Sequence, residues 1–550
     1  MGDAHNDDRS GVLDLAKSAL SELVLHEPQR HPLIIAIVSP LGTPAESVVR
    51  ALEASLARFD YKSKEISMSA LLDDFPSELV GGPLPQRGEN GYYTRRMNAG
   101  DMLRGSFGSG SALAAKAIAR IAEEREREVN GIAFVLRTLK HPDEEALLRH
   151  IYGDAFSLLG VSCSADERRQ TLVDALSTFT DPRSEAEGLI ARDEADPDGN
   201  PFGQHVRALF ERGDAYLPVR RGFDVRPEVD RFIDSVFGAP FVTPRPEEEA
   251  MKIAANASLR SASLGRQVGA ALIPRIGTPV VVGTNEVPKP GGGQYWTEDS
   301  PDHRDFQSGV DPNPVYMRRA IQEILSRLAK HNWLTDEYRE RSDEELWELA
   351  NRLDDRGESV LRGARLSALI EFNRCVHAEQ AAIINAARSG VSTQDARLFT
   401  ITFPCHECTK MIIGAGIVEV VYIEPYPKSL ADRLFRDLID TEPPLNADAE
   451  LVGGRVPFRP FQGIAPRRYE AAFSAGKRKV GEEAVVLSRT ATPKSGAWLE
   501  SAVHEQEGLA LGDAVAREAQ KVAAEVVTRA GISVEIIVFD REGQMRGRSL

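Results

Sequence analysis

Short apolar runs alternate with amphipathic segments over the first 240 residues of the chain. The run LIIAIVSP begins at Leu33 and turns at Gly42 into AESVVRALEASLARF, whose apolar positions recur with helical spacing. Two later runs, GIAFVLRTL and FSLLGVS, have the continuous apolar character of buried strands. Strands that alternate with helices predict an α/β domain built on a parallel sheet.

The pattern changes after the proline-containing stretch GAPFVTPRPEEEA, which we interpret as a linker into a second region that starts near Pro244. There, VGAALIPRIGTPVVVGTNE contains two β-rich runs on either side of a loop, a pattern typical of an antiparallel hairpin. ARLFTITF and VEVVYIEP predict two further strands, and CHECTKMIIGAG between them predicts the start of a helix. Near the C-terminus, VEIIVFD predicts one more strand.

Composition narrows the class of protein. A chain of 550 residues with 42% hydrophobic content is large enough for at least two cores. The net charge of −16 argues against a protein held to nucleic acid mainly by bulk electrostatics. Four cysteines, two of them in a C-x-x-C, do not resemble a secreted disulfide framework, and the chain lacks the run of about 18 apolar residues that a membrane helix needs. We expect a full-length, multidomain cytoplasmic protein with no membrane partner.

His377 and Glu379 stand in CVHAEQAAIINAARSG, which predicts a buried helix that carries both residues. A histidine near an apolar helix face is more often a satisfied core residue than a metal ligand. The motif PCHEC changes this interpretation, because Cys405 and Cys408 place two thiolates at the start of the next predicted helix. With His377 they supply three zinc ligands and leave the fourth tetrahedral position open, as in catalytic zinc sites.

Glu379 has a defined role in such a site. It can lie beside the metal without binding it, take a proton from water, and return protons to the ring nitrogen and the departing ammonia. The arrangement H-x-E followed by P-C-x-x-C is the signature of zinc-dependent nucleobase deaminases. The alternative is a closed structural zinc with His406 or Cys375 as fourth ligand, and it leaves the position of Glu379 unexplained. We expect Cys375 to be a buried neighbour of the site.

The second region resembles the deoxycytidylate deaminase family of zinc-dependent cytidine deaminases. The segments LGRQVGAALI, VVGTNEVP, CVHAEQAAI and FPCHECTKMIIGAGIVEVVYIEPYP follow the order of that family between Leu264 and Pro427. The resemblance implies a three-layer α/β/α fold in which Asn285, in the G-x-N segment, holds the sugar hydroxyl and base of the substrate. Taken alone, an asparagine at the end of a strand is more simply a turn residue.

A longer resemblance is to bacterial antiphage cytosine-nucleotide deaminases, in which a P-loop kinase-like domain precedes the deaminase. It is carried from about Leu33 to Phe473 by MNAGDMLRG, LKHPDEEALLRHIYGDAFSLLG, LIARDE, PFQGIAPRRYEAAF and the insertion containing DHRDFQSGVDPNP. This resemblance implies hydrolytic deamination of free dCTP or dCMP to dUTP or dUMP plus ammonia, which depletes the dCTP pool that a phage needs. It also implies a homo-oligomer.

These resemblances divide the chain into four parts. The expected division is an N-terminal lead at 1–30, a kinase-like domain at 31–240, a deaminase domain at 245–440 with an insertion at 288–363, and a C-terminal extension at 441–550.

The turn SPLGTPAESVV occupies the place of a phosphate-binding loop but matches the Walker A pattern poorly. Aligning Gly42 with its second glycine puts Thr43 in place of the lysine and Pro44 in place of the Ser/Thr, and Glu46 would repel an anion. We therefore expect no phosphoryl transfer. Nucleotide binding by a loop that includes Ser39, Gly42 and Thr43 and a purely structural role both remain open. Candidates for a basic pocket, each more simply a surface charge when taken alone, are Arg137, Lys140, Arg149, Arg168 and Arg169.

Three functions follow as hypotheses. The first is a cytosine-nucleotide deaminase that uses Zn²⁺ on a small-molecule deoxycytidine nucleotide, either in antiphage defence or as a housekeeping dCMP deaminase. The second is a cytosine editor of single-stranded nucleic acid, which needs a basic groove with stacking aromatic residues. The third is a regulatory protein whose N-terminal domain binds a nucleotide, RNA or phage factor.

Overall fold

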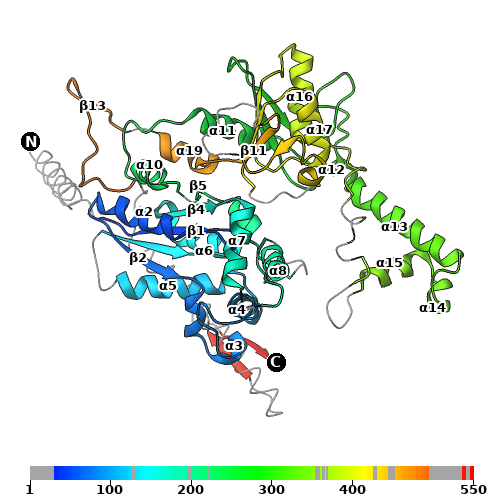
Figure 1. The fold of residues 1–550 in the computed structure, drawn as a ribbon, viewed down its shortest axis with the longest axis horizontal. Coiled ribbons are helices and arrows are strands. Elements are labelled where there is room, and N and C mark those ends of the chain that lie inside the picture. The colour runs from blue at the N-terminus through cyan, green and yellow to red at the C-terminus, as the bar shows by residue number, and fades with distance from the viewer. Residues whose placement is uncertain are drawn as a thin grey trace, which may run out of the picture.

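The computed structural model describes residues 30–125, 131–177, 179–194, 200–220, 222–352, 359–361, 364, 366, 369–424, 430–443, 453–474 and 476–494, and the backbone of two strands near the C-terminus. The predicted N-terminal lead at 1–30 lies almost wholly outside these residues. Two six-stranded sheets organise the described part of the chain (Figure 1). Within it, no helix combines the length and apolar composition needed to cross a membrane.

The first sheet is mostly parallel, in the order β12-β5-β4-β1-β3-β2. The strands predicted for LIIAIVSP, GIAFVLRTL and FSLLGVS are confirmed, and β1 pairs in parallel with both of the other two. A short strand from much later in the chain adds to this sheet in antiparallel orientation beside β5. The strands are β1 (Leu33–Val38), β2 (Lys62–Ser67), β3 (Ile132–Arg137), β4 (Phe156–Ser162), β5 (Ala215–Pro218) and β12 (Gly463–Ile464).

The second sheet is mixed, in the order β10-β11-β9-β8-β6-β7. The predicted hairpin is confirmed, because β6 and β7 pair in antiparallel orientation. The two strands predicted for ARLFTITF and VEVVYIEP are also confirmed, and they pair in parallel. The strands are β6 (Gly269–Ile273), β7 (Val281–Thr284), β8 (Arg397–Thr400), β9 (Glu419–Tyr422), β10 (Ile439–Asp440) and β11 (Val456–Pro460).

Helices cover both faces of each sheet. In the first part they are α2 (Glu46–Ala57), α3 (Ser77–Val80), α4 (Tyr92–Phe107), α5 (Ala112–Arg125), α6 (Pro142–Tyr152), α7 (Ala165–Ala175), α8 (Pro182–Glu194), α9 (Val206–Phe210) and α10 (Arg226–Val236). The helices of the second part, including those of the insertion, are α11 (Pro246–Ser258), α12 (Asp305–Ser308), α13 (Pro312–Lys330), α14 (Asp336–Arg339), α15 (Asp343–Asn351), α16 (Ala378–Ser389), α17 (His406–Gly414), α18 (Ala431–Leu434) and α19 (Tyr469–Phe473).

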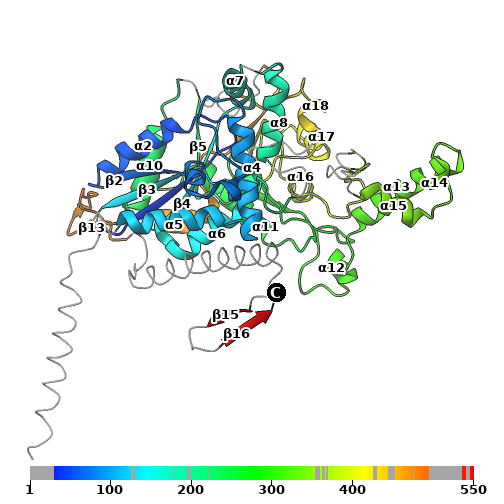
Figure 2. The same ribbon diagram turned by 90° about the horizontal axis from the view of Figure 1, so that it is seen from below.

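The polar insertion forms its own helices. α13, α14 and α15 project away from both sheets in two perpendicular views (Figure 1, Figure 2). Two small hairpins complete the fold, and the second confirms the strand predicted for VEIIVFD. Their strands are β13 (Lys479–Val480), β14 (Glu483–Ala484), β15 (Glu535–Phe539) and β16 (Met545–Ser549).

Both faces of the first sheet are apolar, as expected for a parallel sheet between helices. Alternate residues of a strand point to opposite faces, so the odd-numbered side chains of β1 pack with α2 and α10, and the even-numbered ones with α5 and α6. The core cluster that contains the even-numbered residues of β1 continues through Met251 of α11 to Phe399 of β8 and Val421 of β9. The two sheets therefore share one continuous core, although the sequence pattern predicts two separate regions.

A buried carboxylate fixes the junction between the two parts. Glu248 is fully buried, lies 2.6 Å from Nη1 of Arg231 in α10, and accepts a hydrogen bond of 2.8 Å from the backbone N–H of Ile464 in β12. Loss of one partner of such a buried ion pair costs about 3–5 kcal/mol. β11 and β12 thus bring residues of the predicted extension at 441–550 into both sheets. The boundaries predicted for the four parts of the chain stay predictions.

The opposite face of the second sheet carries α16 and α17. Ala378 and Ala382 of α16 share a core cluster with Cys408 and Ile412 of α17 and with strand residues. α16 lies directly on β7, because a Cβ at Gly283 would be 2.1 Å from the carbonyl oxygen of Ala378 and 2.4 Å from the backbone nitrogen of Ala382. Only a residue without a side chain fits here.

We expect Gly283→Ala to lower the free energy of unfolding by about 3 kcal/mol, because rigid backbone atoms of α16 must move to admit the methyl group. Chemical denaturation of the full chain measures this change. Gly188→Ala is the matched control: nothing lies within 4 Å of a Cβ at this site in α8, so the variant should be as stable as the unmodified protein or slightly more so. Equal stability of the two variants would contradict the close contact.

Candidate functional site

His377 lies immediately before α16 and Glu379 lies in its first turn. The prediction that one helix carries both residues is therefore wrong for His377, which is the N-cap residue with extended backbone angles of φ −67° and ψ 154°. The backbone angles of an N-cap residue are not helical, so the direction of its side chain is not fixed by the face of the helix that follows. Glu379 is on the helix, as predicted, and is 3% exposed.

Cys405 and Cys408 meet His377 at the start of α17. Nδ1 of His377 lies 3.2 Å from Sγ of Cys405 and 3.3 Å from Sγ of Cys408. Cys405 is the N-cap residue of α17, and its sulfur accepts a hydrogen bond of 3.4 Å from the backbone N–H of Cys408. Tetrahedral zinc with ordinary Zn–N and Zn–S bonds separates its ligand atoms by about 3.5 Å. The three side chains therefore fit a zinc ion.

Each titratable group of this cluster has a shifted pKa. The hydrogen bond from Cys408 lowers the pKa of Cys405 to about 4, and the same bond raises the pKa of Cys408 well above its ordinary value. The hydrogen bond with Cys405 raises the pKa of His377. Zinc binds cysteine as the thiolate, so metal binding to this cluster is coupled to loss of the thiol protons.

Glu379 stands beside the ligand cluster. Its Oε2 lies 3.5 Å from Sγ of Cys408, and burial of the carboxylate raises its pKa. A carboxyl group beside a metal site can take a proton from water and return it to a substrate. Its position therefore matches the predicted proton shuttle.

A cavity of about 380 Å³ adjoins the cluster and is lined by His377, Glu379 and Cys405. Asn285, the predicted substrate-binding residue, also lines it. Its side chain accepts a hydrogen bond of 2.7 Å from the backbone N–H of Val268 and donates one of 2.6 Å to the carbonyl of Arg266. Asn285 thus braces the loop before β6, and its contact with substrate stays a prediction.

Several residues of the cavity carry no motif that would reveal them in the sequence. Asn373 has its Nδ2 3.5 Å from Nε2 of His377, the ring nitrogen opposite the sulfurs. Glu424 is fully buried at the end of β9 and lines the cavity. Asp305 and Asn313 come from the insertion, so the insertion shapes the cavity. The nearness of Asn373 to the histidine motif is the one signal that sequence reasoning could have used.

The alternative zinc ligands lie apart from the cluster. Among the described residues, the metal-binding group consists of His377, Cys405 and Cys408 alone. Cys375 is buried, as predicted, with its Sγ 3.9 Å from a carboxylate oxygen of Asp305. His406 instead has its Nε2 4.0 Å from a carboxylate oxygen of Glu407. The structure therefore favours an open site over a closed structural one.

The candidate nucleotide-binding loop lines a different cavity, in the first sheet. Ser39, Gly42 and Thr43 all contribute to it, as do Arg137 and Lys140 from the predicted basic set. Gly42 has φ of 87°, and a Cβ there would lie 2.5 Å from the carbonyl oxygen of Arg168. The other predicted cations are not part of this lining: Arg149 pairs with Asp214 and Glu145, Arg169 pairs with Asp166, and Arg168 approaches the loop through its backbone carbonyl.

Comparison with known proteins identifies the region around the ligand cluster. A family model for the cytidine and deoxycytidylate deaminase zinc-binding region matches residues 244–424, which contain all the predicted metal ligands and Glu379. Because the matched family binds zinc and the His377 group could hold a metal ion, both observations bear out the prediction of Zn²⁺ as cofactor.

Individual relatives are similar over a short segment only. A probable deoxycytidylate deaminase of Drosophila melanogaster is 50% identical over 48 residues, 9% of this chain and 23% of the relative. The deoxycytidylate deaminase of Enterobacteria phage T4 is 43% identical over 54 residues, 10% of this chain and 28% of the relative. The chain thus spans about a quarter of the length of these relatives.

A solved structure, of the dCMP deaminase from the cyanophage S-TIM5 in complex with dCMP and dUMP, is 19% identical to this chain. The alignment covers 36% of this chain and 93% of that one, with a TM-score of 0.20. The two sheets of the described chain themselves make it a mixed α/β protein with parallel strands in both sheets. Its residues 244–424 are similar to the zinc-binding region of cytidine and deoxycytidylate deaminases.

Proposed function

We propose that this chain is a zinc-dependent deaminase of free cytosine deoxynucleotides. The proposal rests on the short distances between Nδ1 of His377 and the sulfurs of Cys405 and Cys408. This group lies beside the buried carboxylate of Glu379, at the wall of a cavity. An open metal position next to a proton-transfer group is the arrangement that hydrolytic deamination requires.

Zinc and Glu379 have different roles in the proposed reaction. Zinc, when bound, supplies Lewis acidity that makes water nucleophilic near neutral pH. Glu379 takes one proton from the attacking water and gives it to the ring nitrogen. It then takes the second proton from the hydroxyl group that the water leaves on the ring carbon and gives it to the departing amine. A C–O bond forms at the amine-bearing carbon, the C–N bond breaks, and the products are a uracil nucleotide and ammonia.

The substrate is dCTP or dCMP, and the proposed role is depletion of the dCTP pool during phage infection. Support comes from the likeness of the chain's segments to antiphage deaminases and from the insertion residues Asp305 and Asn313 in the cavity wall. We propose likewise that the first sheet belongs to an adapted P-loop kinase-like domain and that the chain forms a homo-oligomer.

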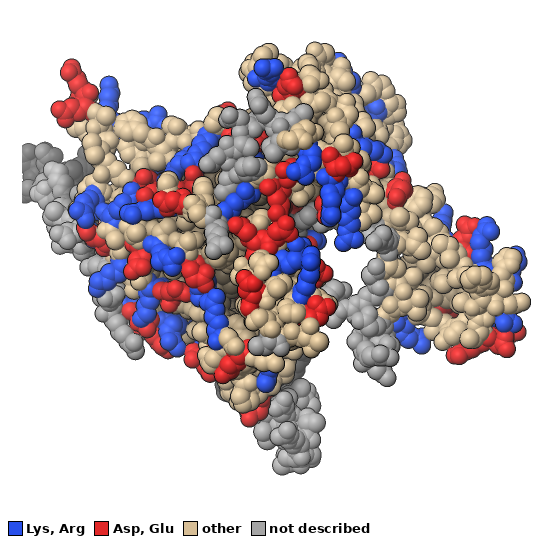
Figure 3. Space-filling model, viewed as in Figure 1, with Lys and Arg blue, Asp and Glu red and all other residues tan. Residues whose placement is uncertain are grey.

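The charge distribution supports a small substrate over a polynucleotide. On the face shown in Figure 3, acidic and basic side chains of the described residues are interspersed, and no continuous basic track crosses this face. An editor of single-stranded nucleic acid needs such a track to follow the phosphate backbone.

We expect Glu379→Gln to lower kcat for deamination at least about 1,000-fold while the protein keeps its zinc, because the amide fills the same space but transfers no proton. Steady-state kinetics with dCMP and metal analysis of the same samples measure both effects. Glu371→Gln, a change at a nearby exposed glutamate, should leave kcat unchanged. Activity of Glu379→Gln close to that of the unmodified protein would refute the assigned role.

We expect about one zinc per chain in the purified protein and loss of that zinc in Cys405→Ser, since a serine hydroxyl is a much poorer zinc ligand than a thiolate. Cys375→Ser is the matched control and should retain the metal, because its sulfur lies outside the ligand group. Elemental analysis by mass spectrometry gives the metal content. If both variants kept zinc, or both lost it, the assignment of Cys405 as a ligand would be wrong.

A further inference from the structure

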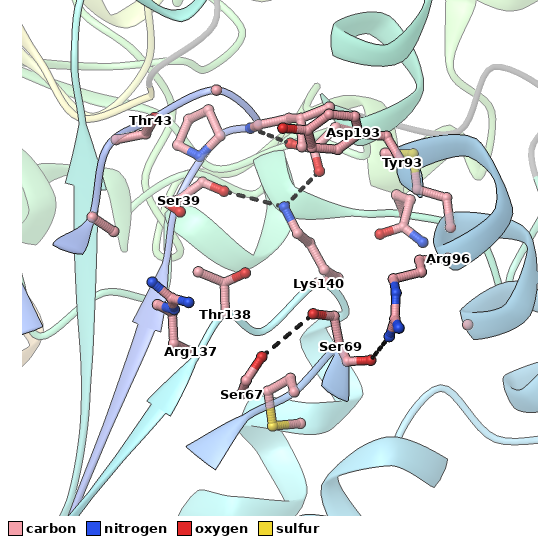
Figure 4. Close-up of a pocket in the computed structure, with 18 of the residues that line it drawn as sticks. Ser39, Thr43, Ser67, Ser69, Tyr93, Arg96, Arg137, Thr138, Lys140 and Asp193 are labelled. Carbon is pink, nitrogen blue, oxygen red and sulfur yellow. Dashed lines mark hydrogen bonds and ion pairs between the residues drawn. The ribbon is translucent and has the colours of Figure 1, made fainter. Parts of the chain in front are cut away.

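A second cavity of about 380 Å³ lies at the carboxyl ends of β1, β2 and β3 in the first sheet. The loop from Ser39 to Glu46, residues that follow β2 and β3, and α4 form its walls (Figure 4). Ligand sites of open parallel sheets occur at this edge. The deamination chemistry proposed above makes no use of this cavity.

The phosphate-binding position of the loop is already filled by a carboxylate of the chain itself. Asp193 of α8 is fully buried, and its Oδ2 accepts a hydrogen bond of 2.7 Å from the backbone N–H of Leu41. Its Oδ1 lies 2.6 Å from Nζ of Lys140, which also donates to the carbonyl of Ser39 (Figure 4). A loop amide and a lysine, the groups that would hold a phosphate, therefore bind Asp193 instead.

Other cations of the cavity are also paired with carboxylates. Arg137 lies 3.2 Å from an oxygen of Glu46 and 3.0 Å from one of Glu65. Arg96 donates to Asp73 at 3.0 Å and to the carbonyl of Ser69 at 2.6 Å. A polyanionic ligand would have to break these pairs. The cavity therefore suits a ligand of little net charge.

One carboxylate oxygen in the cavity wall has an ion-pair partner but no hydrogen-bond donor among the described residues. Glu144 is 1% exposed, and its Oε2 accepts hydrogen bonds from the backbone N–H groups of Lys140 and His141. Its Oε1 accepts no hydrogen bond from the described residues. Burying a carboxylate oxygen without a donor costs about 1–3 kcal/mol, so a ligand that supplies an N–H or O–H group gains that free energy.

A donor stands beside this acceptor. Nη1 of Arg104 lies 3.8 Å from Oε1 of Glu144, while the hydrogen bonds of Arg104 to Phe202 and Asp101 use its Nε and Nη2. An acceptor and a donor side by side match the edge of a nucleobase, where an N–H or amino group lies next to a ring nitrogen or carbonyl.

Apolar and aromatic side chains also line the cavity. Met68 and Leu72 follow β2, Tyr93 and Met97 come from α4, and Leu113 comes from α5. Side chains of this kind pack well against the faces of a planar ring. We propose that this cavity binds a nucleoside or free nucleobase, with the edge of the base on Glu144 and Arg104.

The same helix end that closes this cavity reaches the deaminase cavity. Asp193 is followed by Glu194, whose carboxylate contacts Arg207 of α9. Nε of Arg207 lies 3.2 Å from Oε1 of Glu424, which lines the deaminase cavity. Arg104, one of the two groups proposed to hold the base, is joined to the same helix, because Arg104 and Arg192 of α8 both pair with Asp101. A ligand on Arg104 is thus connected through Asp101 and the end of α8 to a buried carboxylate at the other site, and the nucleoside acts as an effector.

Isothermal titration calorimetry on the full chain tests the binding site. Unphosphorylated ribo- and deoxyribonucleosides and free bases are titrated beside the corresponding mono- and triphosphates, in the Glu379→Gln background so that no substrate is consumed. We expect at least one nucleoside or base to bind once per chain, with no gain in affinity from phosphates. Absence of any such binding, or tighter binding of triphosphates by tenfold or more, would overturn the proposal.

Two variants locate the ligand. Gly100→Leu should weaken binding at least tenfold by filling the cavity. Gly100 lies inside α4 and has no positive φ, and a Cβ there makes an ordinary contact of 3.5 Å with the side chain of Arg104. Glu144→Gln can keep an oxygen on the two backbone N–H groups while its NH₂ replaces the free acceptor, so it should also weaken binding tenfold. Gly188→Leu, on the exposed side of α8, is the control and should bind normally. Unchanged affinity in Gly100→Leu would place the ligand elsewhere and refute the site.

Coupling is measured as the change in dCMP affinity that the nucleoside causes, again by calorimetry without turnover. We expect a change of fivefold or more, and Arg207→Gln should abolish it while the nucleoside still binds. If dCMP binds with the same affinity in both conditions, the effector role is wrong. If dCMP does not bind at all while the nucleoside does, the proposed deaminase function fails and the nucleoside site stands.

Discussion

The close approach of α16 to β7 is the contact on which the candidate site depends. Gly283 has no side chain, so the first turn of α16 can lie directly on the sheet. The position of this turn determines where the side chains of the N-cap residue His377 and of Glu379 lie. α17 packs on the same face in the same core cluster, which brings the sulfurs of Cys405 and Cys408 within 3.3 Å of the imidazole. The three candidate metal ligands therefore depend on the packing of these helices on the sheet for their positions.

Packing also joins the two sheets into one body. The core of the first sheet continues through α11 to β8 and β9 of the second, and β12 returns from the second part to pair with β5. Glu248 and Arg231 close this junction in a buried ion pair. Because the end of α8 lies between the two cavities, a change in one part has a short structural route to the other.

Local patterns of the sequence predict the strands well, and they single out three side chains that the structure brings together. The apolar runs at Leu33, Ile132 and Phe156 form the expected strands, and spacing alone identifies Cys405 and Cys408 as a pair. Contacts between residues far apart in the chain leave no such pattern. Asp193 binds the amide of Leu41 across 152 positions, and Ile464 reaches Glu248 across 216, so neither contact can be anticipated from periodicity. The N-cap position of His377 was missed because the helical pattern of its segment does not fix where the helix begins.

Conversion of free deoxycytidine nucleotides is the central claim, and a substrate panel tests it most directly. The zinc-loaded full chain is incubated with dCMP, dCTP, CTP, cytidine and a cytosine-containing single-stranded oligonucleotide, with and without a chelator, and products are separated by chromatography while ammonia is assayed. The account predicts dUMP or dUTP together with one equivalent of ammonia, both lost with the chelator. Conversion of the oligonucleotide alone, or of none of these compounds under zinc-replete conditions, would contradict it.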